Sequence, residues 1–218
     1  MLEKFLPRIE FDSYEDFKKN YKVDIPQDFN FGFDIVDGYA KERPEKKALV
    51  WCDDNGNEKT ITYDELSKLS SKTANFFKSV GIKKGDVVLM ILRRRYEYWI
   101  CAAALHKVGA TLIPGSMQLT KKDIAYRVNA ANVKMMICVN DSFVVEQTEL
   151  ALPETTALKN LVLVDGKREG WHNFDEAIEN QSDVFERPAH DDPECTHNDD
   201  IMLVYFHKSL SYFIMLLD

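Results

Sequence analysis

The chain has 218 residues, of which 45% are hydrophobic and 29% charged, with nine glycines and seven prolines. This composition is typical of an ordinary folded protein and excludes collagenous and low-complexity chains. The 36 acidic residues outnumber the 28 basic ones and give a net charge of −8, which argues against a nucleic acid partner because phosphate backbones are bound by basic surfaces.

The cysteines and the amino terminus indicate where the chain resides. The four cysteines are far apart and form no C-x-x-C pair: Cys52, Cys101, Cys138 and Cys195. They predict reduced thiols and a cytoplasmic location. The first residues contain no apolar core of a secretory signal, and several acids among them disfavour a transit peptide. The longest apolar run, Trp99–Leu105, is far shorter than the roughly 18 residues of a membrane span.

The first 31 residues are aromatic and charged without clear periodicity, and they predict an extended arm that packs on a folded body. From Phe33 the pattern becomes helical. The helix is expected to end near Arg43-Pro44, because the residue before a proline is disfavoured in the α conformation.

A β-hairpin is expected next. Two short strands, Ala48–Cys52 and Lys59–Thr62, flank a polar turn rich in Asp, Asn and Gly. Thr62 and Glu65 then form a capping box, and apolar residues recur at helical spacing until Gly81. The sequence therefore predicts a long amphipathic helix directly after the hairpin.

Strands and helices then alternate. Residues 86–92 are almost wholly apolar, as in a strand buried on both faces of a parallel sheet. Helices are expected at Tyr96–Lys107, Lys121–Ala131 and about Phe143–Leu150, and strands at Ala110–Ile113, Met135–Val139 and Leu161–Val164. This alternation predicts an α/β fold with Rossmann-like βαβ layers and a mostly parallel sheet.

Residues 165–200 are polar and acidic, and they predict a surface segment with a short helix at Phe174–Glu179, followed by a strand at Ile201–Phe206. His190, Cys195 and His197 in this segment are metal-ligand types, but their spacing matches no zinc or EF-hand pattern. A solvated acidic linker is the favoured interpretation, and no metal ligand is assigned.

Ligands of open α/β sheets bind beyond the carboxyl ends of the strands. The loop 114–119 lies at such an end, where Gly115 permits close approach and Ser116 and Gln118 offer hydrogen-bonding groups; the competing interpretation is a plain turn. Arg93–Arg95 also follow a strand, and they either face an acidic substrate or pair with local acids such as Glu97.

His106 is alone on an apolar helix and is expected to be a core residue with its hydrogen bonds satisfied. The sequence contains no G-x-G-x-x-G, Walker A, G-x-S-x-G or H-E-x-x-H motif. The residues alone therefore predict an α/β domain of unassigned function.

Several segments in order resemble the amino-terminal part of the AMP-forming acyl-CoA synthetases, over about residues 33–206. The matching segments are Thr62–Leu66, Gly81–Val88, Ala104–Ile113 and Asp123–Val128. The loop Pro114–Leu119 is most similar to the medium-chain branch. The resemblance implies a ligase that activates a carboxylic acid with ATP and Mg²⁺ to an acyl-adenylate and then transfers the acyl group to CoA. It also implies that Gly115, Ser116 and Gln118 border the CoA and acyl channel.

In the family, the strand matching Ile201–Phe206 is followed by a Thr/Ser/Gly-rich loop with a lysine that wraps the ATP phosphates. Here His207-Lys208-Ser209 follows, and no later residue is glycine. We therefore expect an incomplete acyl-CoA synthetase fold, with an arm at 1–31, a partial synthetase domain at 32–206 and an aberrant tail at 207–218. A frameshift, a different splice, a deletion and a deliberate truncation are all open as its origin.

Such a chain is expected to be inactive alone, so whether it is an enzyme stays open, and no catalytic or ATP-binding residue is assigned. No cofactor is expected to bind it tightly. Its uncovered apolar strands predict self-association. The alternative function is a non-catalytic module that binds CoA or a partner protein. A membrane anchor in the tail is disfavoured by its short length and by the central His207-Lys208.

Overall fold

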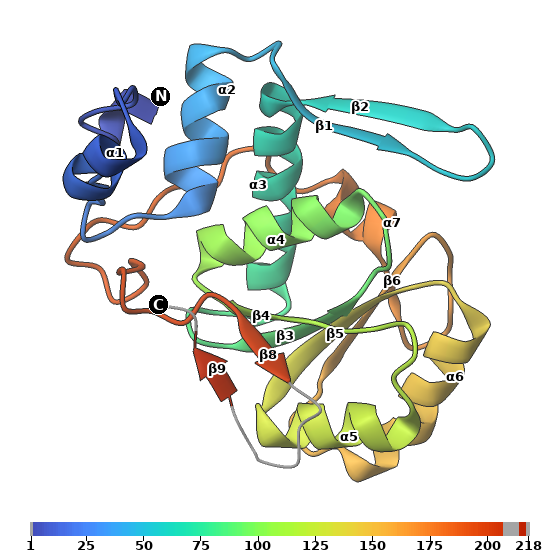
Figure 1. Cartoon of the computed structure of the whole chain (residues 1–218). Helices are drawn as coiled ribbons and strands as arrows, with labels where there is room; N and C mark the ends of the chain where they lie inside the picture. Colours follow the sequence, from blue (N-terminus) through green and yellow to red (C-terminus); the bar gives the residue numbers. More distant parts are fainter. Residues whose placement is uncertain (1, 207–213, 217–218) are drawn as a thin grey trace.

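Strand β3, Val87–Ile91, lies second from one edge of the main sheet and is buried on both faces. The computed structural model describes residues 2–206 and 214–216. Within them, a parallel five-stranded sheet has the order β4-β3-β5-β6-β7 (Figure 1). Its strands are β3 Val87–Ile91, β4 Thr111–Pro114, β5 Val133–Val139, β6 Asn160–Val164 and β7 His172–Asn173. The predicted parallel α/β fold is confirmed, and every predicted strand of this sheet is present; the two-residue β7 was not predicted.

Helices cover both faces of this sheet (Figure 1). The helices after the hairpin are α3 Tyr63–Ser79, α4 Glu97–Val108, α5 Lys121–Ala130, α6 Ser142–Ala151, the short η3 Leu152–Glu154 and α7 Phe174–Glu179. Val88 and Met90 pack with α3, α4 and α7, whereas Leu89 and Ile91 pack with α5 and α6. The alternation of side chains along β3 thus produces two hydrophobic cores, one on each face.

The amino-terminal part contains more helix than the sequence predicts. The helix expected from Phe33 is present as η2 Phe31–Asp37, a π-helix, and α2 Gly38–Glu42. Residues 1–31 are not wholly extended, because they include η1 Leu2–Lys4 and α1 Tyr14–Asn20. The side chain of Ser13 caps α1 by accepting a hydrogen bond from the backbone N–H of Asp16 at 3.2 Å.

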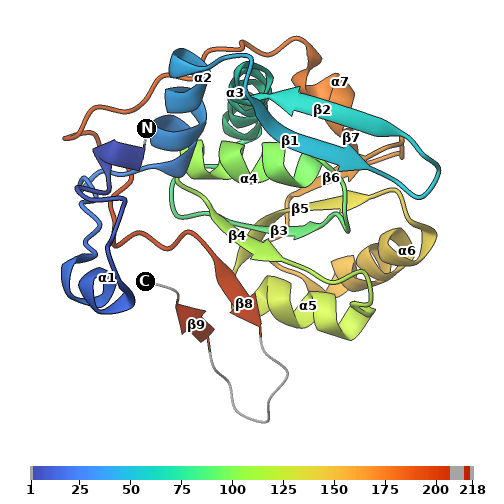
Figure 2. The ribbon, with the colours of Figure 1, turned by 45° about the horizontal axis from the view of Figure 1, so that its top comes forward.

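The predicted hairpin and the helix after it are both confirmed. Strands β1 Lys47–Cys52 and β2 Glu58–Thr62 pair antiparallel. At the start of α3, the backbone N–H of Glu65 donates to Thr62 Oγ1 at 3.2 Å, and the N–H of Thr62 donates to the Glu65 carboxylate at 2.8 Å. Figure 2 shows that the hairpin extends along the side of the molecule at which the parallel strands end.

The segment after α7 returns to the β4 edge of the sheet. The backbone N–H of Leu112 donates to the Met202 carbonyl at 3.0 Å, and Leu112 forms a parallel bridge with Leu203. Strand β8, Val204–Phe206, then pairs antiparallel with β9, Ile214–Leu216. The strand predicted at Ile201–Phe206 is therefore present in its second half. Apart from β9, the predicted tail 207–218 lies outside the described residues.

Among the helices of the described part of the chain, none combines the length and the apolar character needed to cross a membrane.

Candidate functional site

A cavity of about 360 Å³ lies beyond the carboxyl ends of β3 and β5, beside the turn of the β1–β2 hairpin. Its lining residues come from the hairpin, from the segments after β3 and β5, and from the loop after β4: Trp51, Cys52, Asp53, Asp54, Asn55, Arg93, Arg94, Arg95, Met117, Val139, Asn140 and Asp141. This is the edge of the sheet at which α/β folds bind ligands.

Arg95 is held in place by protein groups. Its guanidinium donates to the Glu97 carboxylate at 2.7 and 3.0 Å and forms an ion pair with Asp165 at 3.2 Å. The hydrogen bond with Glu97 raises the pKa of Arg95. The guanidinium also lies over the rings of Trp51 and Tyr96. For Arg95, the expected pairing with local acids is confirmed, and this side chain orders the wall of the cavity.

Arg93 and Arg94 differ from Arg95, because both are exposed and neither pairs with a carboxylate among the described residues. The backbone of Arg93 has a φ of 51°, in the left-handed region that a residue other than glycine rarely adopts. The Arg94 carbonyl accepts a 2.7 Å hydrogen bond from the indole N–H of Trp51. The hairpin therefore fixes the backbone on which two cationic side chains border the cavity.

The acidic residues of the cavity have structural partners, with one exception. Asp53 accepts hydrogen bonds from the backbone and the side chain of Asn57 at 2.9 and 2.8 Å, and these bonds lower the pKa of Asp53. Asp141 caps α6 by accepting from the Phe143 N–H at 3.1 Å. Asp54 is exposed. Among the described residues, the unpaired charges at the rim are therefore Arg93, Arg94 and Asp54.

The loop after β4 contributes fewer of its residues to the lining of the cavity than the sequence predicts. Ser116 and Gln118 are exposed and do not line the cavity; Ser116 Oγ accepts from the Gln118 N–H at 3.2 Å, as in a local turn. A Cβ on Gly115 would lie 2.7 Å from Ile91 Cγ1, so this glycine permits close packing on β3. Met117 is the residue of this loop that reaches the cavity.

Sequence analysis missed the contribution of the hairpin to this site. Trp51 and Asp53 are about forty positions before Arg93 in the chain, and no local pattern indicates that they meet. The one available signal was the position of the hairpin turn, a polar loop with a neighbouring exposed thiol, Cys52.

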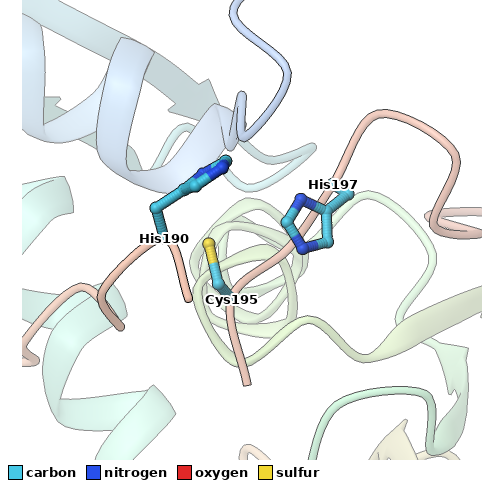
Figure 3. A group of neighbouring side chains, drawn as sticks. All are labelled: His190, Cys195 and His197. Carbon is cyan, nitrogen blue, oxygen red and sulfur yellow. The ribbon is translucent and has the colours of Figure 1, made fainter. Parts of the chain in front are cut away.

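The expected hydrogen bonds of the His106 ring are not found, and the expected solvated acidic linker is exposed at most but not all of its residues. Both ring nitrogens of His106 are buried without a hydrogen-bond partner among the described residues, so this half-buried histidine is not satisfied. Cys195 is only 2% exposed, so residues 189–200 are not simply a solvated linker. The structure brings His190, Cys195 and His197 together, with one potential ligand atom from each inside 4.8 Å of the others (Figure 3).

Comparisons with known proteins agree with this architecture. Residues 36–206 match the family model described as AMP-binding enzyme. Human mitochondrial acyl-coenzyme A synthetase ACSM3 is 33% identical over 207 residues, which cover 92% of this chain and 34% of that protein. Rat mitochondrial acyl-coenzyme A synthetase ACSM5 is 33% identical over 193 residues, covering 85% of this chain and 32% of that protein. The chain thus spans about a third of the length of these curated relatives.

A solved structure supports the fold. The anthranilate CoA ligase AuaEII, in complex with anthranoyl-AMP, superposes with a TM-score of 0.75 at 19% identity, covering 87% of this chain and 34% of the ligase. The expected resemblance is therefore confirmed at the level of sequence family and of architecture. The chain belongs to the AMP-binding enzyme family and corresponds to an amino-terminal region of the acyl-coenzyme A synthetases.

Proposed function

We propose that this chain supplies the amino-terminal part of an acyl-CoA synthetase, which activates a carboxylic acid with ATP and transfers the acyl group to CoA. The observation that carries the proposal is the cavity at the carboxyl ends of β3 and β5, within the part of the chain that matches the AMP-binding family. The proposed domain comprises residues 32–206, with residues 1–31 as an arm that packs on it.

The lining of the cavity suits part of a CoA or acyl ligand. Arg93 and Arg94 provide exposed cations for an anionic group, and Met117 and Val139 provide an apolar wall. Gly115, Ser116 and Gln118 belong to the same loop as Met117 but lie outside the cavity lining, and we propose that they border the rest of the CoA and acyl channel, with the Gln118 amide as a hydrogen-bonding group. The volume of about 360 Å³ is near the lower end of ligand pockets, and we propose that the described residues form one side of a larger binding site.

The described residues do not provide a cradle for a triphosphate. Nucleotide phosphates are held by consecutive backbone N–H groups of glycine-rich loops and by a lysine. No residue after Gly170 in the printed sequence is glycine. The 218-residue chain alone is therefore not expected to bind ATP and Mg²⁺ productively or to form an acyl-adenylate.

The test is ATP–pyrophosphate exchange by the purified chain with short-chain and medium-chain carboxylic acids. We expect exchange no faster than in a blank without protein, because the electrostatic stabilisation of the transferring groups is missing. Human ACSM3 serves as the positive control. Exchange above the blank, in a preparation free of host synthetases, would contradict the proposal.

A second function is favoured by the two unpaired arginines. The chain would then act as a non-catalytic module that holds CoA by its phosphates. Each charge-assisted hydrogen bond contributes about 1.5–3 kcal/mol, so loss of both arginines is expected to weaken CoA binding at least about a hundredfold.

Calorimetric titration with CoA tests this second function. The double variant R93A/R94A is compared with K18A/K19A, which removes the same charge from α1, away from the cavity. We expect weaker binding in the first variant alone. Absence of CoA binding to the wild-type chain, or an equal loss in both variants, would exclude the module.

The proposed location is the cytoplasm, based on the four free cysteines. The matched relatives carry the word mitochondrial in their names. Imaging of the chain fused at its carboxyl terminus to a fluorescent protein distinguishes the two compartments, and overlap with a mitochondrial marker would overturn the cytoplasmic assignment.

A further inference from the structure

Three side chains that commonly bind transition metals converge in the segment before β8. The ligand atoms of His190, Cys195 and His197 all lie within 4.8 Å of one another. The two imidazole rings are 5.7 Å apart between centroids, at an interplanar angle of 88°. Figure 3 shows the Cys195 thiol pointing between the two rings. We propose that these residues form a zinc site.

The backbone that carries the three side chains is ordered by its own turns. The N–H of Cys195 donates to the Asp192 carbonyl at 2.9 Å. The N–H of His197 donates to the Asp200 carboxylate at 2.8 Å, and the N–H of Asp200 donates back to the His197 carbonyl at 3.0 Å. Two consecutive turns therefore place the ligands, so that the metal does not have to order the loop when it binds.

The same segment is attached to other parts of the molecule. Lys84 Nζ donates to the Cys195 carbonyl at 2.6 Å, and Asn30 Nδ2 donates to Thr196 Oγ1 at 3.0 Å. Asn198 Nδ2 donates to the Pro26 carbonyl at 2.9 Å. The proposed ligands thus lie between the arm, the α3–β3 connection and the strand β8, where a bound ion would stabilise all three attachments.

The donor set selects the metal. One thiolate and two imidazoles are suited to Zn²⁺, which binds sulfur at about 2.3 Å and nitrogen at about 2.0–2.1 Å in tetrahedral sites. Tetrahedral angles then require donor separations of about 3.3–3.6 Å. The widest present separation, up to 4.8 Å, must therefore close by roughly 1 Å, and rotation of the His190 side chain, which is 66% exposed, provides this movement.

The carboxylate of Asp28 lies next to one of the proposed zinc ligands. It lies 3.8 Å from His190 Nδ1. Histidine ligands commonly donate their second ring N–H to a carboxylate, which fixes the tautomer and the ring orientation. Asp28 is therefore a positioning residue that directs His190 Nε2 to the metal, and a water molecule takes the fourth position.

Cobalt substitution in the full 218-residue chain tests the site without any enzymatic assay. After treatment with chelator, Co²⁺ is titrated into the protein and then displaced with Zn²⁺. We expect one equivalent to bind and to give a thiolate-to-cobalt charge-transfer band that Zn²⁺ abolishes. The band should be absent in Cys195→Ser and present in Cys52→Ser, which removes an exposed thiol elsewhere.

Because Cys195 is buried, its substitution can affect folding, and a second variant keeps the test decisive. His190→Gln replaces an exposed side chain, and His172→Gln is the matched control on β7. Loss of one ligand is expected to reduce zinc affinity at least about tenfold, since loss of a hydrogen-bonding partner behind a ligand already costs that much.

Two results would overturn the zinc site. One is equal zinc affinity in the His190→Gln and His172→Gln variants. The other is a wild-type chain that is folded by circular dichroism and does not bind zinc at micromolar concentration. In the second case the three side chains would form a cluster that holds no metal, with the Cys195 thiol directed at the Thr196 carbonyl at 3.6 Å.

Discussion

The ring nitrogens of His106 are buried and have no hydrogen-bond partner in the part of the chain that the structure describes, and burial lowers the pKa of His106 from 6.5 to about 4. The unfolded chain therefore takes up this proton first as the pH falls. The contribution of the neutral His106 side chain to the free energy of unfolding is fully present above about pH 6.5. It is lost progressively as the pH falls toward about 4. The change of the His106 pKa from 6.5 to about 4 corresponds to a loss of at most about 3 kcal/mol in the free energy of unfolding.

The variant His106→Leu is expected to remove this part of the acid sensitivity, because leucine does not titrate. Urea unfolding at about pH 7 and about pH 4.5 measures the free energy of unfolding of both proteins. His172→Leu, at an exposed position, should retain the wild-type dependence. If the wild-type chain and His106→Leu lose equal stability between the two pH values, His106 is not buried in its neutral form.

Lys107 is a second buried titratable residue, and it has partners. Its side chain is 0% exposed, and Nζ donates to Asp37 Oδ1 at 2.7 Å and to Ser71 Oγ at 2.9 Å. Burial lowers the pKa of Lys107. Removal of one partner from a buried ion pair leaves a charge uncompensated and costs about 3–5 kcal/mol.

Asp37→Ala is therefore expected to lower the free energy of unfolding by about 3 kcal/mol. Lys107→Met is expected to lower it by less, because the Asp37 carboxylate is 18% exposed and still accepts a hydrogen bond from Ser67 Oγ. In the double variant the methionine should recover most of the loss, since no buried charge then remains. Chemical denaturation of the four proteins measures this coupling. Simple additivity of the two single effects would show that the pair is not energetically linked.

At the scale of the elements, the junction of β4 with its loop shows why a glycine is required there. A Cβ at position 115 would meet Ile91 Cγ1 at 2.7 Å and the Met90 carbonyl oxygen at 3.2 Å, on the neighbouring strand β3. Gly115→Ala is expected to destabilise the protein by about 1–3 kcal/mol through overpacking. Gln118→Ala, at an exposed position in the same loop, should change stability by less than about 0.5 kcal/mol.

Thermal and urea unfolding of both variants test this assignment. A Gly115→Ala chain as stable as Gln118→Ala would show that the loop can move away from β3. The result also bears on the site, because it separates the packing role of Gly115 from a role in ligand binding.

Most element boundaries were predictable because they depend on local chemistry. The Thr62–Glu65 capping box places the start of α3, and the left-handed Gly109 (φ 77°) ends α4. The start of α1 also has a local signal, Ser13 followed by acids, but α1 has no buried residue and hence no apolar periodicity to detect. The two-residue β7 is too short for any pattern and exists through its pairing with β6.

At the scale of the whole molecule, apolar side chains remain exposed in β8 and in the segment just before it. Ile201, Met202 and Tyr205 are 49%, 47% and 42% exposed. Because exposed apolar strand edges pair with other chains, we predict that the chain self-associates at tens of micromolar. Light scattering should report a mass above the monomer.

The double variant Ile201→Lys/Tyr205→Lys is expected to shift the chain toward the monomer. Val184→Lys, at another exposed apolar position, should leave the association unchanged. A monodisperse wild-type monomer would contradict the prediction, and equal effects of both variants would locate the association elsewhere.

The sequence by itself determined the fold class and nearly all the helices and strands, since periodicity, caps and turns are local properties of the chain. The family followed from its resemblance to the AMP-forming acyl-CoA synthetases. Only the tertiary structure decided which distant residues meet. In the folded chain the hairpin turn lies beside Arg93 and Arg94. Met117, and not the exposed Gln118, lines the cavity. The side chains of His190, Cys195 and His197 lie close together. These contacts depend on strand order and on side-chain packing between segments far apart in the chain, which no local pattern specifies.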